Sequence, residues 1–196
     1  PVPCEEACPV NAISKNAHQK ECIDFSKCIY CGKCINKCPF GAIMEKSQLI
    51  DALNAIKSGK RITAMLAPSV MGHFDATLGR VITAVKKAGF HDVIEVASGA
   101  DLTSQHEALE FIERIKSGEN FITSSCCYSY IELIEKHIPD LKKYFSTTRT
   151  PMQFAAEMVK KSDPEAVIVF ISPCVSKKSE APKSGSVDFV INIEEL

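Results

Sequence analysis

The sequence predicts a small cysteine-rich α+β module, followed by an α/β domain with a mainly parallel sheet flanked by helices. The first observation is that seven of the ten cysteines lie within the first 38 residues. The second is that, from residue 60 onward, short apolar runs alternate with amphipathic helical patterns, an order typical of parallel sheets. We divide the chain into the module at 1–45, a connector helix at 46–60 and the α/β domain at 61–196.

Composition excludes several function classes. The 196 residues are 45% hydrophobic and 24% charged, with a net charge of −1, so no excess of positive charge draws the chain to nucleic acid or acidic lipid. A membrane-spanning helix needs about 20 apolar residues. The longest apolar run, at 166–172, is much shorter and predicts a buried strand. We therefore expect neither nucleic acid nor a membrane as a partner.

The module contains an internal repeat. The pattern Cys-x-x-x-Cys-Pro-x-x-Ala-Ile begins at Cys4 and again at Cys34, 30 residues later, which predicts two pseudo-symmetric halves. Closely spaced cysteines suit several thiolates on one metal centre better than disulfides, whose partners need a particular separation. The leftover Cys22 is expected to be a packing residue.

The run Cys28-x-x-Cys31-x-x-Cys34-x-x-x-Cys38-Pro39 resembles the bacterial two-cluster ferredoxins, in which the cysteine before proline ligates the other 4Fe–4S cluster. The resemblance predicts a ferredoxin-like module whose first cluster is held by Cys28, Cys31, Cys34 and Cys8. Cys4 and Cys38 would serve the second cluster, whose two further cysteines we expect in a segment upstream of this sequence. Zinc is the alternative, although zinc sites usually pair two C-x-x-C hairpins across a longer spacer.

The elements after the module follow from periodicity and stop signals. Gly59, Gly89 and Gly118 end predicted helices, Asp101 or Thr103 begins one, and Pro151 lies in a first turn. Helices are predicted at 47–58, 77–88, 101–116, 130–137 and 151–161. Strands are predicted at 61–66, 91–97, 121–124, 166–172 and 188–193.

Three loops are expected to meet at one site. Pro68-Ser69, Cys126-Cys127 and Cys174 each come directly after a predicted strand. In parallel sheets, ligands gather beyond the carboxyl ends of the strands.

The α/β part resembles the iron–iron hydrogenases. Its matching motifs are Ala67-Pro68-Ser69, Gly99-Ala100-Asp101-Leu102-Thr103, Thr123-Ser124-Ser125-Cys126-Cys127, Ser146 with Thr150-Pro151, and Pro173-Cys174-Val175-Ser176-Lys177-Lys178-x-Glu180. The resemblance implies reversible reduction of protons to H₂ at an H-cluster, a 4Fe–4S cubane joined to a diiron unit with CO, cyanide and a bridging dithiolate. It also implies an anaerobic cytoplasm, a ferredoxin-like electron carrier and hydrogenase maturation factors as partners.

The resemblance assigns roles to individual residues. Cys127 and Cys174 would ligate the catalytic cubane, and Cys126 would be the terminal proton donor and acceptor. Lys177 would hydrogen-bond a cyanide ligand in a pocket lined by Ala67, Pro68, Ser69 and Pro173. Glu107, Ser146 and Glu110 would carry protons between Cys126 and solvent.

The pattern of the 101–116 helix supports a different reading of the two glutamates. Leu102, Leu109, Ile112 and Ile115 form one apolar stripe. Glu107 and Glu110 fall on the opposite arc with Arg114, which predicts a solvated face and a Glu110–Arg114 ion pair. Proton relay and solvated face both stay open at this point.

The sequence departs from the family pattern beside the site. Cys126-Cys127 is followed by Tyr128-Ser129-Tyr130 instead of proline, a small residue and tryptophan, and Ser172 replaces a methionine. These changes indicate a divergent branch. The third family motif, with two more cubane ligands, does not occur, so we interpret 61–196 as an incomplete catalytic domain and expect the segment alone not to be competent.

Three alternative functions remain. A hydrogenase-like H₂ sensor would bind the same cofactor, and an iron–sulfur electron-transfer or assembly protein would lack the diiron unit. The Cys126 and Lys177 positions speak against the second, because both suit a diiron site. A plain ferredoxin is the weakest alternative, since it leaves the α/β domain unexplained.

Overall fold

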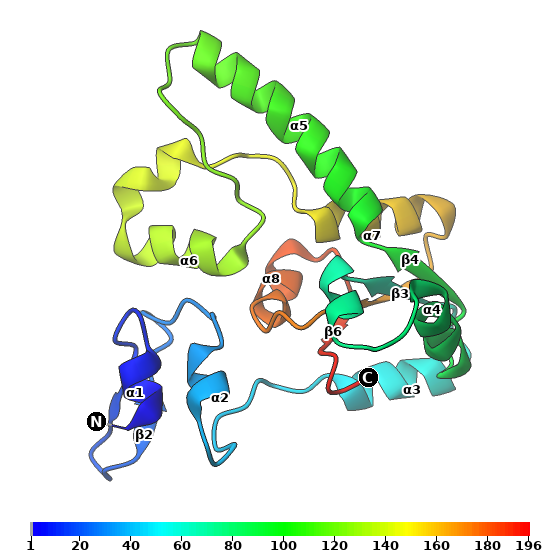
Figure 1. Cartoon of the computed structure of the whole chain (residues 1–196), viewed down its shortest axis with the longest axis horizontal. Coiled ribbons are helices and arrows are strands. Elements are labelled where there is room, and N and C mark those ends of the chain that lie inside the picture. Colours follow the sequence, from blue (N-terminus) through cyan, green and yellow to red (C-terminus); the bar gives the residue numbers. More distant parts are fainter. Residues whose placement is uncertain (1) are drawn as a thin grey trace.

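A computed structural model describes residues 2–196 (Figure 1). The α/β part is built on four parallel strands in the order β4-β3-β5-β6. Their bounds are Ile62–Leu66 for β3, Asp92–Glu95 for β4, Val167–Ile171 for β5 and Phe189–Ile191 for β6. The sheet confirms the predicted parallel α/β architecture.

Helices cover both faces of this sheet. On one side lie α5 and α7, and on the other α3 and α4 (Figure 1). The bounds are Leu49–Lys57 for α3, Leu78–Lys87 for α4, Ala97–Lys116 for α5, Tyr128–His137 for α6, Pro151–Ser162 for α7 and Lys177–Ser184 for α8. Two 3₁₀ helices, η1 at Pro68–Gly72 and η2 at Pro139–Tyr144, complete this part. No helix between residues 2 and 196 is long and apolar enough to cross a membrane.

The strand order places a topological switch point between β3 and β5. From β3 the chain crosses to β4 on one side, and later it returns to β5 and β6 on the other. A crevice opens at such a point beyond the carboxyl ends of the strands. The core beneath it is aliphatic, with Ile62, Met65, Ile168 and Ile171 fully buried.

In the α/β part, the sequence placed most strands and α-helices correctly, with three exceptions. Residues 121–124 form no strand of the sheet, because Thr123 makes only one bridge, to Phe145. Helix α5 begins at Ala97, before the predicted caps Asp101 and Thr103. The helix α8 was not predicted, because Pro182 lies inside it.

The early start of α5 depends on Gly99. A Cβ atom at this position would lie 2.3 Å from the carbonyl oxygen of Pro151 and 2.9 Å from the amide nitrogen of Ala155. Glycine therefore lets the first turn of α5 pack directly against the backbone of α7.

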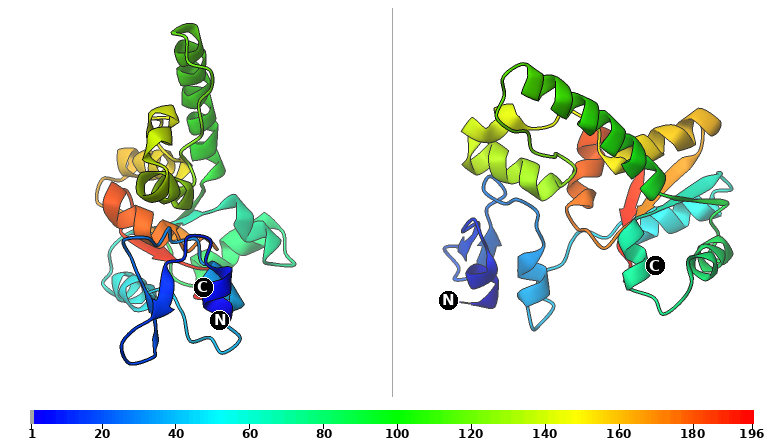
Figure 2. Two further views of the ribbon diagram at one scale, coloured as in Figure 1. Left: turned by 90° about the vertical axis from the view of Figure 1, so that its left-hand side faces the viewer. Right: turned by 45° about the horizontal axis from the view of Figure 1, so that its top comes forward.

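The predicted solvated face of α5 is wrong, and so is the predicted buried stripe. The side chains of Glu110 and Arg114 are only 14% and 15% exposed, whereas Leu109 and Ile112 are 67% and 48% exposed. The reason is that the irregular segment at 143–148 offers backbone groups to α5. Arg114 donates to carbonyls of this segment, and Glu110 accepts from its amides and hydroxyls. The far half of α5 projects beyond the sheet (Figure 2).

The module at the N-terminus repeats its backbone as the sequence predicted. Helices α1 (Pro3–Ala7) and α2 (Lys33–Lys37) are followed by Cys8 and Cys38 in nearly the same conformation. Each of these sulfurs accepts from the amide four residues later at 3.2 Å. Between the helices, β1 (Ile13–Lys15) and β2 (Glu21–Ile23) form an antiparallel hairpin.

Candidate functional site

The site lies at the switch point, where two loops leave neighbouring strands. The amide of Ala67 donates to the carbonyl of Ile171 at 3.0 Å, which ties the end of β3 to the end of β5. Pro68 and Ser69 then begin η1, and Pro173 and Cys174 follow β5. The structure thus brings together two of the three predicted loops.

The third loop, which holds Cys126 and Cys127, does not follow a strand of the sheet and contacts the site through Lys177. The Lys177 Nζ donates to the backbone carbonyl of Cys126 at 3.2 Å and forms an ion pair with Glu180. Glu180 is 5% exposed, and its other oxygen accepts from the Thr150 hydroxyl at 2.8 Å. A buried carboxylate therefore holds the ammonium of Lys177 beside the Cys126 loop.

The three cysteines of this site are accessible thiols. Cys126, Cys127 and Cys174 are all exposed. Cys127 immediately precedes the first turn of α6. The Sγ of Cys174 lies 3.0 Å from the buried hydroxyl of Ser176. Such thiols are suited to ligate iron.

In the module, the four predicted ligands of the first cluster meet. Cys8, Cys28, Cys31 and Cys34 line one small cavity of about 30 Å³. Burial raises the pKa of Cys28 and Cys34, and the neighbouring thiols push in the same direction, so a cationic iron centre would relieve their repulsion. Within residues 2–196, no three Cys, His, Asp or Glu side chains converge closely enough to hold a single metal ion. The choice of an iron–sulfur cluster over zinc therefore rests on the spacing of the cysteines.

The other two predicted ligands of the module do not line this cavity. Cys4 is buried and Cys38 is half-buried. Backbone amides of Phe40 and Ala42 donate to the Cys38 sulfur and lower the pKa of its thiol, which favours the ligating thiolate. Their role at a second cluster stays a prediction.

The module loop that carries Cys31 and Cys34 packs closely against the loop that follows β5. Gly32, between Cys31 and Cys34, has a φ of +74°, and a Cβ there would lie 2.6 Å from Cγ2 of Val175. Val175 directly follows Cys174. The loop that holds Cys31 and Cys34 and the loop that holds Cys174 are therefore in van der Waals contact. The sequence contained no signal for this pairing beyond the glycine itself.

The predicted proton-path residues lie in two separate groups. The Ser124 hydroxyl donates to Glu107 at 2.9 Å, and the Ser146 hydroxyl donates to Glu110 at 2.7 Å. Among the described residues, no hydrogen bond joins the two groups. Burial alone would raise the pKa of Glu110, but hydrogen bonds from Ser146, the Thr147 amide and Arg114 outweigh it and lower the pKa to about 2. This favours a permanently ionised Glu110 that anchors the 143–148 segment.

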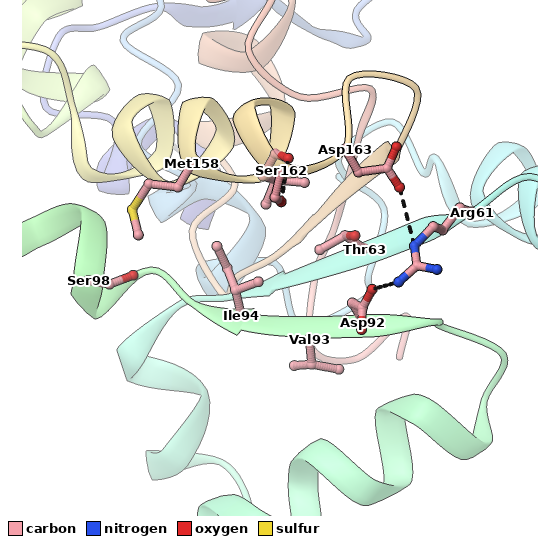
Figure 3. A pocket seen from close by; sticks show the side chains of 10 residues that line it. Arg61, Thr63, Asp92, Val93, Ile94, Ser98, Met158, Ser162 and Asp163 are labelled. Atoms are coloured by element: carbon pink, nitrogen blue, oxygen red, sulfur yellow. Dashed lines mark hydrogen bonds and ion pairs between the residues drawn. The ribbon is translucent and has the colours of Figure 1, made fainter.

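A larger cavity of about 650 Å³ lies at the opposite edge of the sheet (Figure 3). Its polar end holds Arg61, which pairs with Asp92 and Asp163. Both carboxylates are already bound to the guanidinium, so this end of the cavity ties the starts of β3 and β4 to the end of α7 and offers no reactive group.

Comparison with known proteins identifies the family. Residues 60–196 match the model described as iron only hydrogenase large subunit, C-terminal domain. The chain belongs to this hydrogenase family. Residues 1–49 match the LdpA Fe-S cluster-binding domain, which together with the four converging thiols supports iron–sulfur binding by the module.

Hydrogenases and assembly factors both occur among the relatives of this hydrogenase-family chain. Iron hydrogenase 1 of Clostridium pasteurianum is 31% identical over 89% of this chain and 42% of that protein. The NADP-reducing hydrogenase subunit HndD of Solidesulfovibrio fructosivorans is 27% identical over 86% of this chain and 34% of that protein. The cytosolic Fe-S cluster assembly factor NAR1 of Kluyveromyces lactis is 23% identical over 94% and 43%. The chain thus spans between a third and a half of these relatives.

Proposed function

We propose that this chain is the electron inlet and part of the catalytic pocket of an iron–iron hydrogenase that reversibly reduces protons to H₂. The observation that carries the proposal is the contact between Gly32 and Val175. It joins a loop with three predicted cluster ligands to the residue after Cys174. At this position, a ferredoxin-like two-cluster module would transfer electrons into the α/β domain.

Cys127 and Cys174 would hold a catalytic cubane between the α6 terminus and the end of β5. The diiron unit bound beside it would supply the low-valent iron at which two electrons and two protons combine. Ala67, Pro68, Ser69 and Pro173 would enclose it from the switch-point side. Ligands from outside this segment would complete the coordination, because a cubane takes four protein or bridging ligands.

On the proton side, we assign the last step to Cys126 and the fixed positive charge to Lys177. Cys126 is exposed, and a thiol is one of the side chains that can act as a general acid or base. Glu180 keeps Lys177 in place, so its ammonium can donate to an anionic cyanide ligand without reorganising. Glu107 accepts from the hydroxyl of Ser124, two residues before Cys126, and would continue the path.

The deciding experiment is an infrared spectrum of the full-length protein, produced with hydrogenase maturation factors and purified without oxygen. Sharp bands of CO and cyanide stretching are expected. A spectrum without them, from protein with full cubane iron, refutes the hydrogenase proposal. The physiological carrier would be a ferredoxin-like protein in an anaerobic cytoplasm.

A second candidate is an iron–sulfur assembly role without a diiron unit. It is favoured by the match to the NAR1 assembly factor along 94% of this chain and by polar residues such as Tyr128 and Ser172 beside the predicted ligands. The same spectrum separates the two, because only the hydrogenase carries CO and cyanide. Bands accompanied by very slow H₂ turnover would instead indicate an H₂ sensor.

A further inference from the structure

A fully buried carboxylate lies on α6, behind the predicted ligand Cys127. Glu132 is 1% exposed. Its oxygens accept from the Tyr128 hydroxyl and pair with the ammonium groups of Lys136 and Lys183, both at 2.6 Å. Burial alone would raise the pKa of Glu132, but these three donors lower it to about 2. The carboxylate is therefore ionised and fully partnered.

Lys136 links this carboxylate to the cluster module. Besides pairing with Glu132, its Nζ donates to the backbone carbonyls of Cys28 at 2.6 Å and Phe25 at 3.0 Å. The next residue, His137, lies 2.8 Å from the carbonyl of Lys27. Two adjacent residues of α6 thus hold the backbone at residues 25–28, where the loop with Cys28, Cys31 and Cys34 begins.

The same ammonium holds a strained residue of the cluster loop. Tyr30, between Cys28 and Cys31, has a φ of +56°, which a bulky side chain adopts only when its surroundings enforce it. Lys136 Nζ lies 4.9 Å from the centre of the Tyr30 ring, and the ring of Tyr128 packs at 6.2 Å. The α6 surface therefore fixes the shape of the loop that carries the ligands.

We propose that Lys136 is a positioning residue that holds the Cys28 loop against α6 and raises the reduction potential of the cluster in that loop. The inference rests on the iron–sulfur part of the proposed function and not on the diiron unit. Reduction adds one negative charge to a cluster, so a fixed ammonium at a ligand carbonyl stabilises the reduced form. Glu132 acts in the opposite sense, because its charge partly offsets that of Lys136.

The charges around the loop give the signs of the expected effects. Lys136, Lys183 and Glu132 together carry one net positive charge. Lys183 is 63% exposed, so solvent screens it more than Lys136, which is 23% exposed. Lys136→Met removes the cation that touches the ligand backbone. Glu132→Gln removes the anion while an amide of the same shape remains.

The test is a redox titration of the full-length protein followed by electron paramagnetic resonance of the reduced cluster, with the signal assigned by its loss in Cys31→Ser. In Lys136→Met, we expect the equilibrium constant for reduction to fall at least tenfold, 59 mV for a one-electron couple. In Glu132→Gln, the potential should rise. Lys142→Met is the matched control, because this lysine is 63% exposed and pairs with Glu135 away from the module.

Opposite shifts in the two variants support the inference. Shifts of the same sign, as mere loosening of the loop would produce, overturn it, and so do shifts no larger than that of the control. If Lys136→Met loses its cluster iron, the test uses Lys136→Arg instead. This variant must retain the cluster and its wild-type reduction potential, and Glu132→Gln must still raise the potential. Any other result refutes the inference. A blank infrared spectrum with these potential shifts intact would refute the hydrogenase proposal alone. A wild-type protein without a reducible cluster would refute both.

Discussion

Replacing Gly32 with alanine tests the contact on which the electron inlet depends. The variant carries two costs. A left-handed backbone at an alanine costs about 1–2 kcal/mol, and the new Cβ, 2.6 Å from Cγ2 of Val175, overpacks the junction by about 1–3 kcal/mol. In a chain of this size, each kcal/mol lowers the melting temperature by about 2–4 °C. Gly32→Ala should therefore lower it by roughly 4–20 °C.

A matched control separates the two costs. Gly41 also has a positive φ, +59°, but a Cβ there would meet nothing within 4 Å, so Gly41→Ala should show the backbone cost alone. Adding Val175→Ala to Gly32→Ala should recover most of the steric part, which a double-mutant cycle measures as a coupling energy of about 1–3 kcal/mol. The assay is anaerobic thermal unfolding at equal cluster iron. Equal melting temperatures for Gly32→Ala and Gly41→Ala, or no recovery in the double variant, would refute the contact.

Three further predictions concern the catalytic pocket and the α5 helix. Cys126→Ser should abolish nearly all H₂ turnover at unchanged iron content, whereas Cys174→Ser should lose the iron of the proposed catalytic cubane. Loss of iron in Cys126→Ser would instead identify Cys126 as a ligand. Because the folded pKa of Glu110 is lowered to about 2, its stabilising effect is complete above about pH 4.5 and is lost as the pH falls toward 2. Glu110→Gln should thus be less stable at pH 7, and its melting temperature should depend less on acid; an unchanged acid profile would contradict this. Gly99→Ala, whose Cβ would lie 2.3 Å from the Pro151 carbonyl, should lower stability by about 3 kcal/mol or more in thermal unfolding, and a loss below 1 kcal/mol would disprove the close packing.

Local signals were enough for the repeat in the module and for the sheet. The 30-residue repeat predicted two matching halves, because equal spacing of cysteine and proline imposes equal local geometry. The apolar runs predicted the four strands that formed, and the central strands β3 and β5 are almost completely buried, as such runs indicate. Likewise, the loops after β3 and β5 could be placed at one edge from chain order alone.

Non-local contacts caused the failures. The polar arc of α5 is buried because Glu110 and Arg114 serve backbone groups some 30 residues away, and helical periodicity carries no information about such partners. Lys136 and Glu132 look like an ordinary surface pair at i,i+4 spacing, and only the approach of the module reveals their place. The pairing of Gly32 with Val175 lies 143 residues apart in sequence and follows from the docking of two units.

The helix α8 meets the Cys126–α6 segment at both of its ends. Its first residue, Lys177, holds the carbonyl of Cys126, and Lys183 near its last turn holds Glu132 and lies over the ring of Tyr128. The two lysines are six positions apart in the helix, about 9 Å along its axis. A single contact would fix the distance between α8 and the Cys126–α6 segment but would let the segment rotate. Two contacts with the same helix also fix the orientation of the segment, and with it the orientation of the backbone that carries Cys126 and Cys127.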